Sequence, residues 1–246
     1  MYAAWCPDGE DAAGFAARLL DDVAPALLDA GAHMVRVHVT DDEVAPGAGF
    51  FPAGHRRAAL APPIDAVVSA WVDTAVTSRR AGIDGVFADA GIRVAGYLVS
   101  ESVPLAAEDA ASTHDDPAPV RTPGFTQVAF LRVPEGMDPR EWRSRWKDGH
   151  TDVAIDTQST TAYRQNLVVH PLQDDAPTVA AIVEETFPIG ALTDPYVFFD
   201  AVGDDARFSA NVEAMIASTS SFLDTDHGLD TVPASEYVLA AISPRW

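Results

Sequence analysis

The chain has 246 residues, of which 48% are hydrophobic and 22% charged, a composition typical of folded proteins with one large core or two smaller ones. Its 16 Lys and Arg residues against 37 Asp and Glu residues give a formal net charge of −21. That charge repels phosphate backbones and anionic lipid surfaces, so we expect neither nucleic acid nor a membrane as a partner. The lack of a signal-peptide pattern and the single cysteine, Cys6, favour a cytoplasmic protein.

Residues 1–105 alternate between strand-like and helix-like segments. The strand-like runs are 2–6, 32–39, 64–74 and 92–103, and the helix-like segments are 10–30 and 78–90. Between the second and third strands lies a long Gly- and Pro-rich segment, 44–63, which contains Phe50 and Phe51. Segments of this length are typical of functional loops, so we expect either a lid over a binding site or a surface loop.

A break in the pattern at 106–123 predicts a linker, because prolines and small polar residues replace every apolar periodicity there. The predicted domains are therefore 1–105 and 124–246. In the second domain, strands at 124–133, 162–172, 178–187 and 235–242 and helices from 138 and at 204–222 follow the order β-α-β-β-α-β, which is that of a ferredoxin-like unit.

The segment DPREWRSRWKDGH, 138–150, predicts a helix with an unusual face. Asp138 is a good N-cap, and Pro139 suits the first helical position. Trp142, Trp146 and His150 then recur every four residues and share one stripe. We expect the two tryptophans to pack against the sheet.

This Trp-x3-Trp-x3-His helix after a β-strand and a Pro/Gly turn resembles the EthD-type domain of the dimeric α+β barrel superfamily. The resemblance covers 124–246, and residues 1–105 resemble a degenerate copy without the histidine. It implies an α+β fold of two tandem ferredoxin-like βαββαβ units, packed sheet to sheet as an intrachain barrel with a ligand cavity between the sheets. It also implies a small hydrophobic molecule as the partner, and a monomer or a homodimer.

Strand alternation predicts which side chains face that cavity. In HMVRVHV, Val35, Val37 and Val39 share one face, which we assign to the helices, so that Arg36 and His38 face the interior. The same argument places further polar and aromatic side chains inside: Ser69, Trp71, Asp73, Asn166 and His170.

Two classes of function follow. The first is an enzyme of the cyclase, isomerase or cofactor-free oxygenase type, in which His38, His150 or His170 acts as general acid or base and Arg36 stabilises an enolate or carboxylate. The residues expected to bind its substrate are Trp71, Asp73, Asn166, Phe50 and Phe51. The second is a non-catalytic binding or accessory protein of the same fold, in which Trp71, Trp142 and Trp146 simply fill the core. For His150 by itself, the alternative to an acid, base or ligand contact is a structural role at the helix end. A haem-binding protein is a third hypothesis. The chain lacks nucleotide-binding and zinc-hydrolase motifs, and we expect neither a metal nor a cofactor.

Overall fold

A computed structural model of the chain describes residues 1–49, 63–107, 118–224 and 230–239. Most of the predicted strands and helices lie where alternation and capping place them. The strands are β1 (Tyr2–Trp5), β2 (Met34–Val39), β3 (Ala66–Trp71), β4 (Arg93–Leu105), β5 (Val120–Arg121), β6 (Phe125–Leu131), β7 (Ala162–Pro171), β8 (Ala181–Phe187) and β9 (Asp230–Leu239).

Eight of these strands form one closed antiparallel barrel in the order β2-β3-β1-β4-β7-β8-β6-β9. Two pairings join the halves of the chain: β4 pairs with β7, and β9 pairs with β2. The short β5 pairs with residues 237–238 of β9, and β6 pairs with the earlier residues 230–234 of the same strand. The barrel therefore contains strands from both halves of the chain in a single sheet.

The predicted fold class, two ferredoxin-like βαββαβ units packed sheet to sheet, is wrong. The strands of the two halves are joined edge to edge, so no pair of separate sheets exists to pack face to face. The physical reason is that an isolated sheet leaves backbone N–H and C=O groups unpaired along its edges, and closure of the barrel pairs them. The amphipathic pattern of each strand is compatible with both arrangements and does not distinguish between them.

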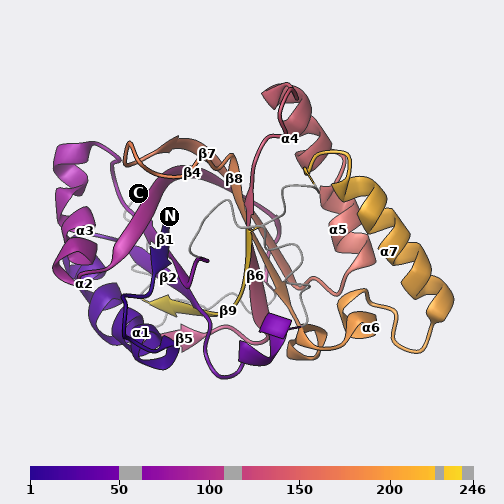
Figure 1. The fold of residues 1–246 in the computed structure, drawn as a ribbon, viewed down its shortest axis with the longest axis horizontal. Helices are drawn as coiled ribbons and strands as arrows, with labels where there is room; N and C mark the ends of the chain where they lie inside the picture. The colour runs from indigo at the N-terminus through magenta and orange to yellow at the C-terminus, as the bar shows by residue number, and fades with distance from the viewer. Residues whose placement is uncertain (50–62, 108–117, 225–229, 240–246) are drawn as a thin grey trace.

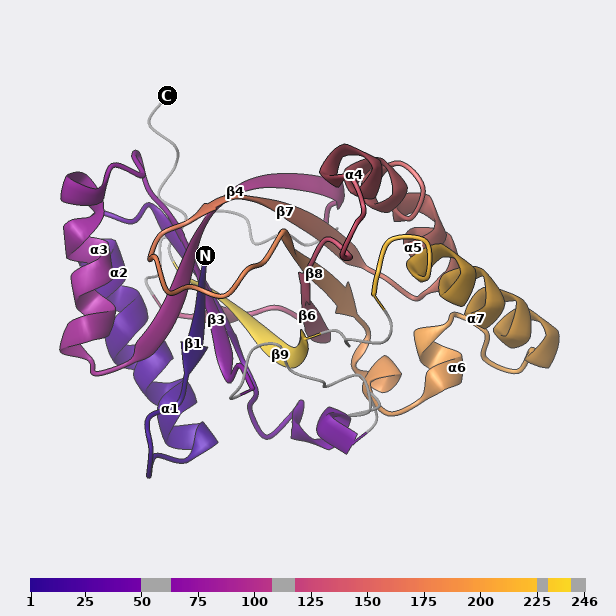
Figure 2. The ribbon, with the colours of Figure 1, turned by 45° about the horizontal axis from the view of Figure 1, so that its top comes forward.

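The helices lie outside the barrel in two groups (Figures 1 and 2). On one side are α1 (Ala12–Arg18), a π-helical segment (Leu19–Val23), α2 (Ala24–Asp29) and α3 (Thr77–Asp89). On the opposite side are α4 (Pro139–Lys147), α5 (Thr151–Thr157), α6 (Pro195–Phe198) and α7 (Asp205–Thr219). Short 3-10 segments lie at Ala45–Gly49 and Ile189–Leu192.

The first group packs closely on the sheet. Val35, Val37 and Val39 of β2 are buried in one cluster with Phe15, Leu19 and Leu27 from the helical segments. The second group packs unevenly: α4 is anchored by two tryptophans, whereas no residue of α7 is buried. This difference leaves space between α7 and the sheet.

Helix α4 begins as its sequence predicts. Asp138 caps it by accepting hydrogen bonds from the backbone N–H groups of Arg140 and Glu141. Trp142 and Trp146 are fully buried, and the indole Nε1 of Trp142 donates a hydrogen bond to the carbonyl oxygen of Phe222 (3.1 Å). The chain turns immediately after α4, so His150 precedes α5 and does not extend the same helix.

Parts of two predicted segments lie outside the described residues. Within the predicted linker 106–123, residues 108–117 are not described, and β5 occupies 120–121. Within 44–63, a 3-10 segment occupies Ala45–Gly49, and residues 50–62 are not described.

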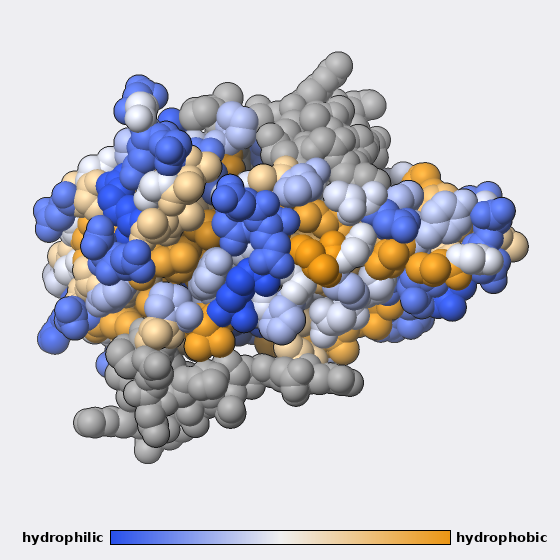
Figure 3. All heavy atoms as spheres, turned by 90° about the horizontal axis from the view of Figure 1, so that it is seen from below, coloured by the Kyte–Doolittle hydropathy of each residue, from blue (hydrophilic) through white to orange (hydrophobic). Residues whose placement is uncertain are grey.

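The described surface mixes hydrophilic and hydrophobic residues, with hydrophobic patches near the middle of the face in Figure 3. In the described parts of the chain, no helix has the length and apolar character needed to cross a membrane.

Closure of the barrel predicts the hydrogen-exchange behaviour of β2. Its backbone amides from Val35 to Val39 lie between β3 and β9, so they should exchange as slowly as those of β1, which lies inside the sheet. Exchange of the β2 amides facing β9 within seconds, measured by NMR while the β1 amides stay protected, would contradict a closed barrel.

Candidate functional site

The barrel interior contains a buried network of charged side chains. The guanidinium of Arg36 donates from Nη1 to Glu184 Oε2 (3.0 Å), and its Nε lies 3.5 Å from Glu236 Oε2. The Nε2 atom of His38 lies 3.2 Å from the same carboxylate oxygen, and Arg164 donates to it from Nη1 (2.6 Å). Thus residues from β2, β7, β8 and β9 meet across the barrel.

The charges of this network stabilise one another. Burial alone raises the pKa of Glu236, but its hydrogen bond to His38 and the nearby charge of Arg36 bring that pKa well below its ordinary value. Burial also raises the pKa of Glu184, but the combined electrostatic effect of Arg36, His38 and Arg164 is larger and lowers it. Burial lowers the pKa of the Arg36 guanidinium. The negative charges of Glu184, Glu236 and Glu101 together have a larger effect and raise that pKa.

The network also has unsatisfied members. Among the described residues, four buried side-chain atoms around it have no hydrogen-bond partner: Arg36 Nε, His38 Nδ1, Ser69 Oγ and Glu184 Oε1. Such atoms are uncommon in proteins and indicate ordered water or a ligand.

Several of the predicted site residues belong to this network. Arg36 and His38 are buried in it, and the side-chain amide of Asn166 donates to Glu184 (3.4 Å). Trp71 is half-buried, with the Arg36 guanidinium 4.8 Å from its ring centre. Strand alternation therefore places these four side chains correctly relative to one another.

The remaining predicted interior residues do not join them. Asp73 follows the end of β3, and its exposed side chain pairs with His33 (2.6 Å). His170 is exposed near the end of β7, beyond a register shift opposite Leu98 and Val99. A bulge of this kind breaks the alternation on which the prediction depends. Phe50 and Phe51 lie outside the described residues.

A cavity in the second half of the chain lies outside the barrel, between the sheet and the helices. Its volume is about 440 Å³. The floor comes from β6, β7 and β8, and the roof from α6, α7 and the turn after α7. Five of its sixteen lining residues are Trp, Tyr or Phe: Trp146, Tyr163, Phe198, Phe199 and Phe222.

Glu185 is the carboxylate of this cavity. On the outer face of β8, it lies in register between Gln127 of β6 and Tyr163 of β7. Its Oε1 atom is buried and has no hydrogen-bond partner among the described residues, and burial raises its pKa to about 7. Some surface of the residue is still accessible because it borders the cavity. Glu185 therefore exchanges a proton near neutral pH.

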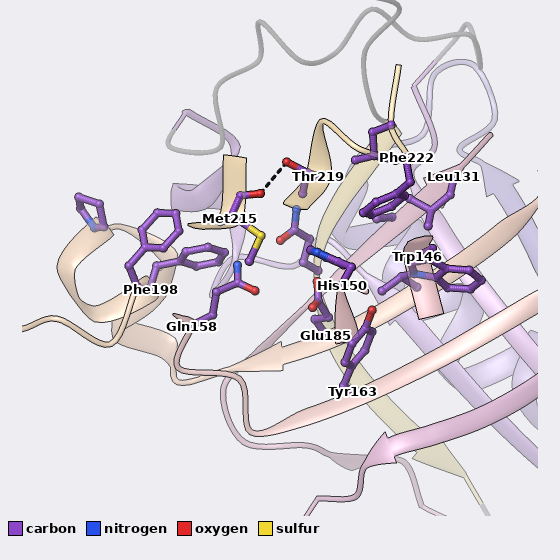
Figure 4. A pocket seen from close by; sticks show the side chains of 16 residues that line it. Leu131, Trp146, His150, Gln158, Tyr163, Glu185, Phe198, Met215, Thr219 and Phe222 are labelled. Atoms are coloured by element: carbon purple, nitrogen blue, oxygen red, sulfur yellow. Dashed lines mark hydrogen bonds between the residues drawn. The ribbon is translucent and has the colours of Figure 1, made fainter. Parts of the chain in front are cut away.

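His150 lines the same cavity and is neutral at pH 7. Its Nδ1 is 2.9 Å from Ser218 Oγ, and its ring packs 4.8 Å from that of Phe222. Burial lowers its pKa to about 4. Figure 4 shows His150, Glu185 and Tyr163 together in the middle of the lining, with Phe198 towards one end and Phe222 towards the other.

The most important residues that the sequence reasoning missed are the two adjacent glutamates, Glu184 and Glu185. The signal was present in AIVEETF, 181–187: two carboxylates follow one another in an otherwise apolar strand. Because successive side chains point to opposite faces, one of them had to face each side of the sheet.

No family model matches the chain, and no curated protein matches it either. The chemistry of the site is therefore inferred from its geometry alone.

Removal of the Glu236 charge should strongly destabilise the protein. In Glu236→Gln, the guanidinium groups of Arg36 and Arg164 stay buried with one carboxylate fewer, which we expect to cost about 3–5 kcal/mol of unfolding free energy. Urea unfolding at pH 7 measures this, with the exposed Glu213→Gln as a matched control. A loss below about 1 kcal/mol would show that the network does not hold buried charges together.

Glu185 should make stability fall as the pH rises. Its folded-state pKa of about 7 lies above the ordinary 4.5, so the stabilising neutral form is fully populated below pH 4.5 and is lost as the pH rises through 7. The loss relative to Glu185→Gln should reach up to about 3 kcal/mol at pH 8. Unfolding of both proteins at pH 5 and pH 8 tests this, and an unchanged difference between them would contradict the assignment.

Proposed function

We propose that the protein binds a small, largely apolar or aromatic carbonyl compound in the cavity between the sheet and α7, and that Glu185 transfers a proton to and from it. The observation that carries the proposal is a carboxylate with an unpartnered oxygen in a cavity lined by aromatic rings. The proposed activity falls in the class expected from the sequence, that of small-molecule isomerases and cyclases. Its general base is Glu185, whereas the sequence analysis expected a histidine.

The size and lining of the cavity support this class of ligand. Sites for small organic molecules usually have volumes of about 300–1,000 Å³, are mostly apolar and carry a few polar groups. Here the polar groups include Gln158, whose Oε1 is also buried without a partner among the described residues. A ligand hydroxyl group could donate a hydrogen bond to it.

The protonation states support proton transfer. With a pKa of about 7, Glu185 is present both as carboxylate and as acid at neutral pH, so it can remove a proton from the carbon beside a carbonyl. It can return that proton to the same carbon or, where a C=C bond is conjugated with the enolate, to the far end of that bond. The electron pair of the broken C–H bond moves to the carbonyl oxygen to give an enolate. Neutral His150 is suited to stabilise the enolate oxygen. When the Ser218 hydroxyl donates to Nδ1 of His150, the ring proton is on Nε2, and this N–H group can donate a hydrogen bond to the enolate.

We also propose that the chain is a member of the EthD-type family. It is supported by the buried pair Trp142 and Trp146, which anchors α4, and by the position of His150 in the cavity that α4 helps to form.

Deuterium exchange of 2-indanone, an aromatic ketone with acidic C–H groups, tests the proposal. The protein should accelerate exchange of these protons in D₂O, followed by NMR, with a rate that rises through a pH near 7. Glu185→Gln should lower the rate at least about 100-fold and still bind the ketone, while Glu213→Gln should leave the rate unchanged.

Three outcomes would count against it. Equal exchange rates for Glu185→Gln and the unchanged protein would remove Glu185 from the reaction. Binding without any accelerated exchange would leave a binding protein and overturn the catalytic part. Retention of a haem by the purified protein, visible in its absorption spectrum, would replace the proposal with haem chemistry.

A further inference from the structure

A second, smaller cavity of about 210 Å³ lies against the first-half strands and does not share residues with the cavity of Glu185. Side chains from β3, β4, β7 and α3 line it, and it borders the charged network of the barrel. At about 30 Å³ for each water-sized group, it accommodates a molecule of roughly five to seven non-hydrogen atoms.

The cavity contains a buried hydroxyl without a partner. Ser69 is 3% exposed, lines the cavity, and its Oγ makes no hydrogen bond with any described residue. Asn166 also lines it, and because its Nδ2 donates to Glu184, its amide oxygen is available as an acceptor. The cavity therefore presents a buried hydroxyl that lacks a partner among the described residues, beside an amide oxygen that can accept a hydrogen bond.

The cavity borders a carboxylate that the cations of the network hold only weakly. Three carboxylates, those of Glu101, Glu184 and Glu236, face the guanidinium groups of Arg36 and Arg164 and the imidazole of His38, whose Nε2 lies 3.2 Å from Glu236 and 3.7 Å from Glu184. Glu101 is the least neutralised of the three: its Oε2 lies 3.4 Å from Arg36 Nη1, which has a closer partner in Glu184 at 3.0 Å. Its side chain lines the cavity and is 27% exposed.

Two further groups that line the cavity, Arg80 and the Met1 amino group, do not pair with Glu101. The guanidinium of Arg80 is held by Asp84 (3.0 Å) and by the carbonyl oxygen of Ala75 (2.7 Å). The Met1 amino group donates to the carbonyl oxygen of Tyr97 (2.9 Å), and burial lowers its pKa to about 5, so it adds no charge at pH 8.

We propose that this cavity binds a small organic ammonium ion, whose N–H groups donate to Glu101, Ser69 and Asn166. Glu101 and Asn166 lie opposite each other in the β4–β7 register, so a single ammonium group can reach both. The alkyl part then lies against apolar lining residues such as Val99 and Leu172. An anion of the same size would meet the weakly paired Glu101 carboxylate and be repelled.

Isothermal titration calorimetry at pH 8 with n-butylammonium chloride tests the site, with sodium butyrate and 1-butanol as ligands of similar length. The ammonium ion should bind, and the butyrate should not. Glu101→Gln should weaken ammonium binding at least about tenfold, because a charge-assisted hydrogen bond is lost. Ser69→Ala should weaken it less and leave the thermal unfolding temperature unchanged or higher, since it removes an unpartnered hydroxyl.

Glu213→Gln is the matched control, an exposed glutamate on α7, and its affinity should equal that of the unchanged protein. Butyrate binding as tight as that of butylammonium would overturn the proposal. So would ammonium binding that persists in Glu101→Gln, or that is lost in Glu185→Gln, since the ion would then occupy the other cavity. Because the two cavities share no residue, the 2-indanone experiment can fail while this site stands.

Discussion

The structure depends on the alternation of side chains across a closed sheet. Because successive residues of β8 point to opposite faces, Glu184 lies inside the barrel and its neighbour Glu185 lies outside. Inside, the combined electrostatic effect of Arg36, His38 and Arg164 outweighs burial and holds the pKa of Glu184 below its ordinary value. Outside, burial without a cation raises the pKa of Glu185 to about 7. One peptide bond thus separates a carboxyl group whose pKa is lowered from one whose pKa is raised.

Closure of the barrel determines which side chains meet inside it. Pairing of β2 with β9 places His38 directly opposite Glu236, and pairing of β4 with β7 places Glu101 opposite Asn166. These contacts join residues from the two halves of the chain, so the interior network cannot form within either half alone. The outer cavity has a different origin: Trp142 and Trp146 anchor α4 on the sheet, while α7 buries no residue and leaves room for a ligand.

Local physical chemistry predicted much of this from the sequence. Alternation in β2 placed Arg36 and His38 on the face opposite Val35 and Val37, and the cap at Asp138 predicted the start of α4. The tertiary arrangement was not predicted, because edge-to-edge and face-to-face packing use the same strand pattern. His170 was misplaced because a register shift interrupts the alternation, and Asp73 because β3 ends at Trp71.

The candidate site likewise depends on tertiary features that the local sequence pattern does not show. The spacing of Trp142, Trp146 and His150 identified the helix, but α4 ends at Lys147, and His150 precedes α5 with its Nδ1 beside Ser218 Oγ. The depth of burial around Glu185 depends on how far α7 stands from the sheet, and no local pattern in the sequence encodes that separation.

The most direct test of the account is a pH titration of the glutamate carboxyl carbons by ¹³C NMR, with Glu184→Gln and Glu185→Gln used to assign the two signals. The account predicts a midpoint near pH 7 for Glu185 and one below the ordinary 4.5 for Glu184. Titration of both carboxyls together, near pH 4.5 with the exposed glutamates, would contradict the placement of these two side chains in different environments.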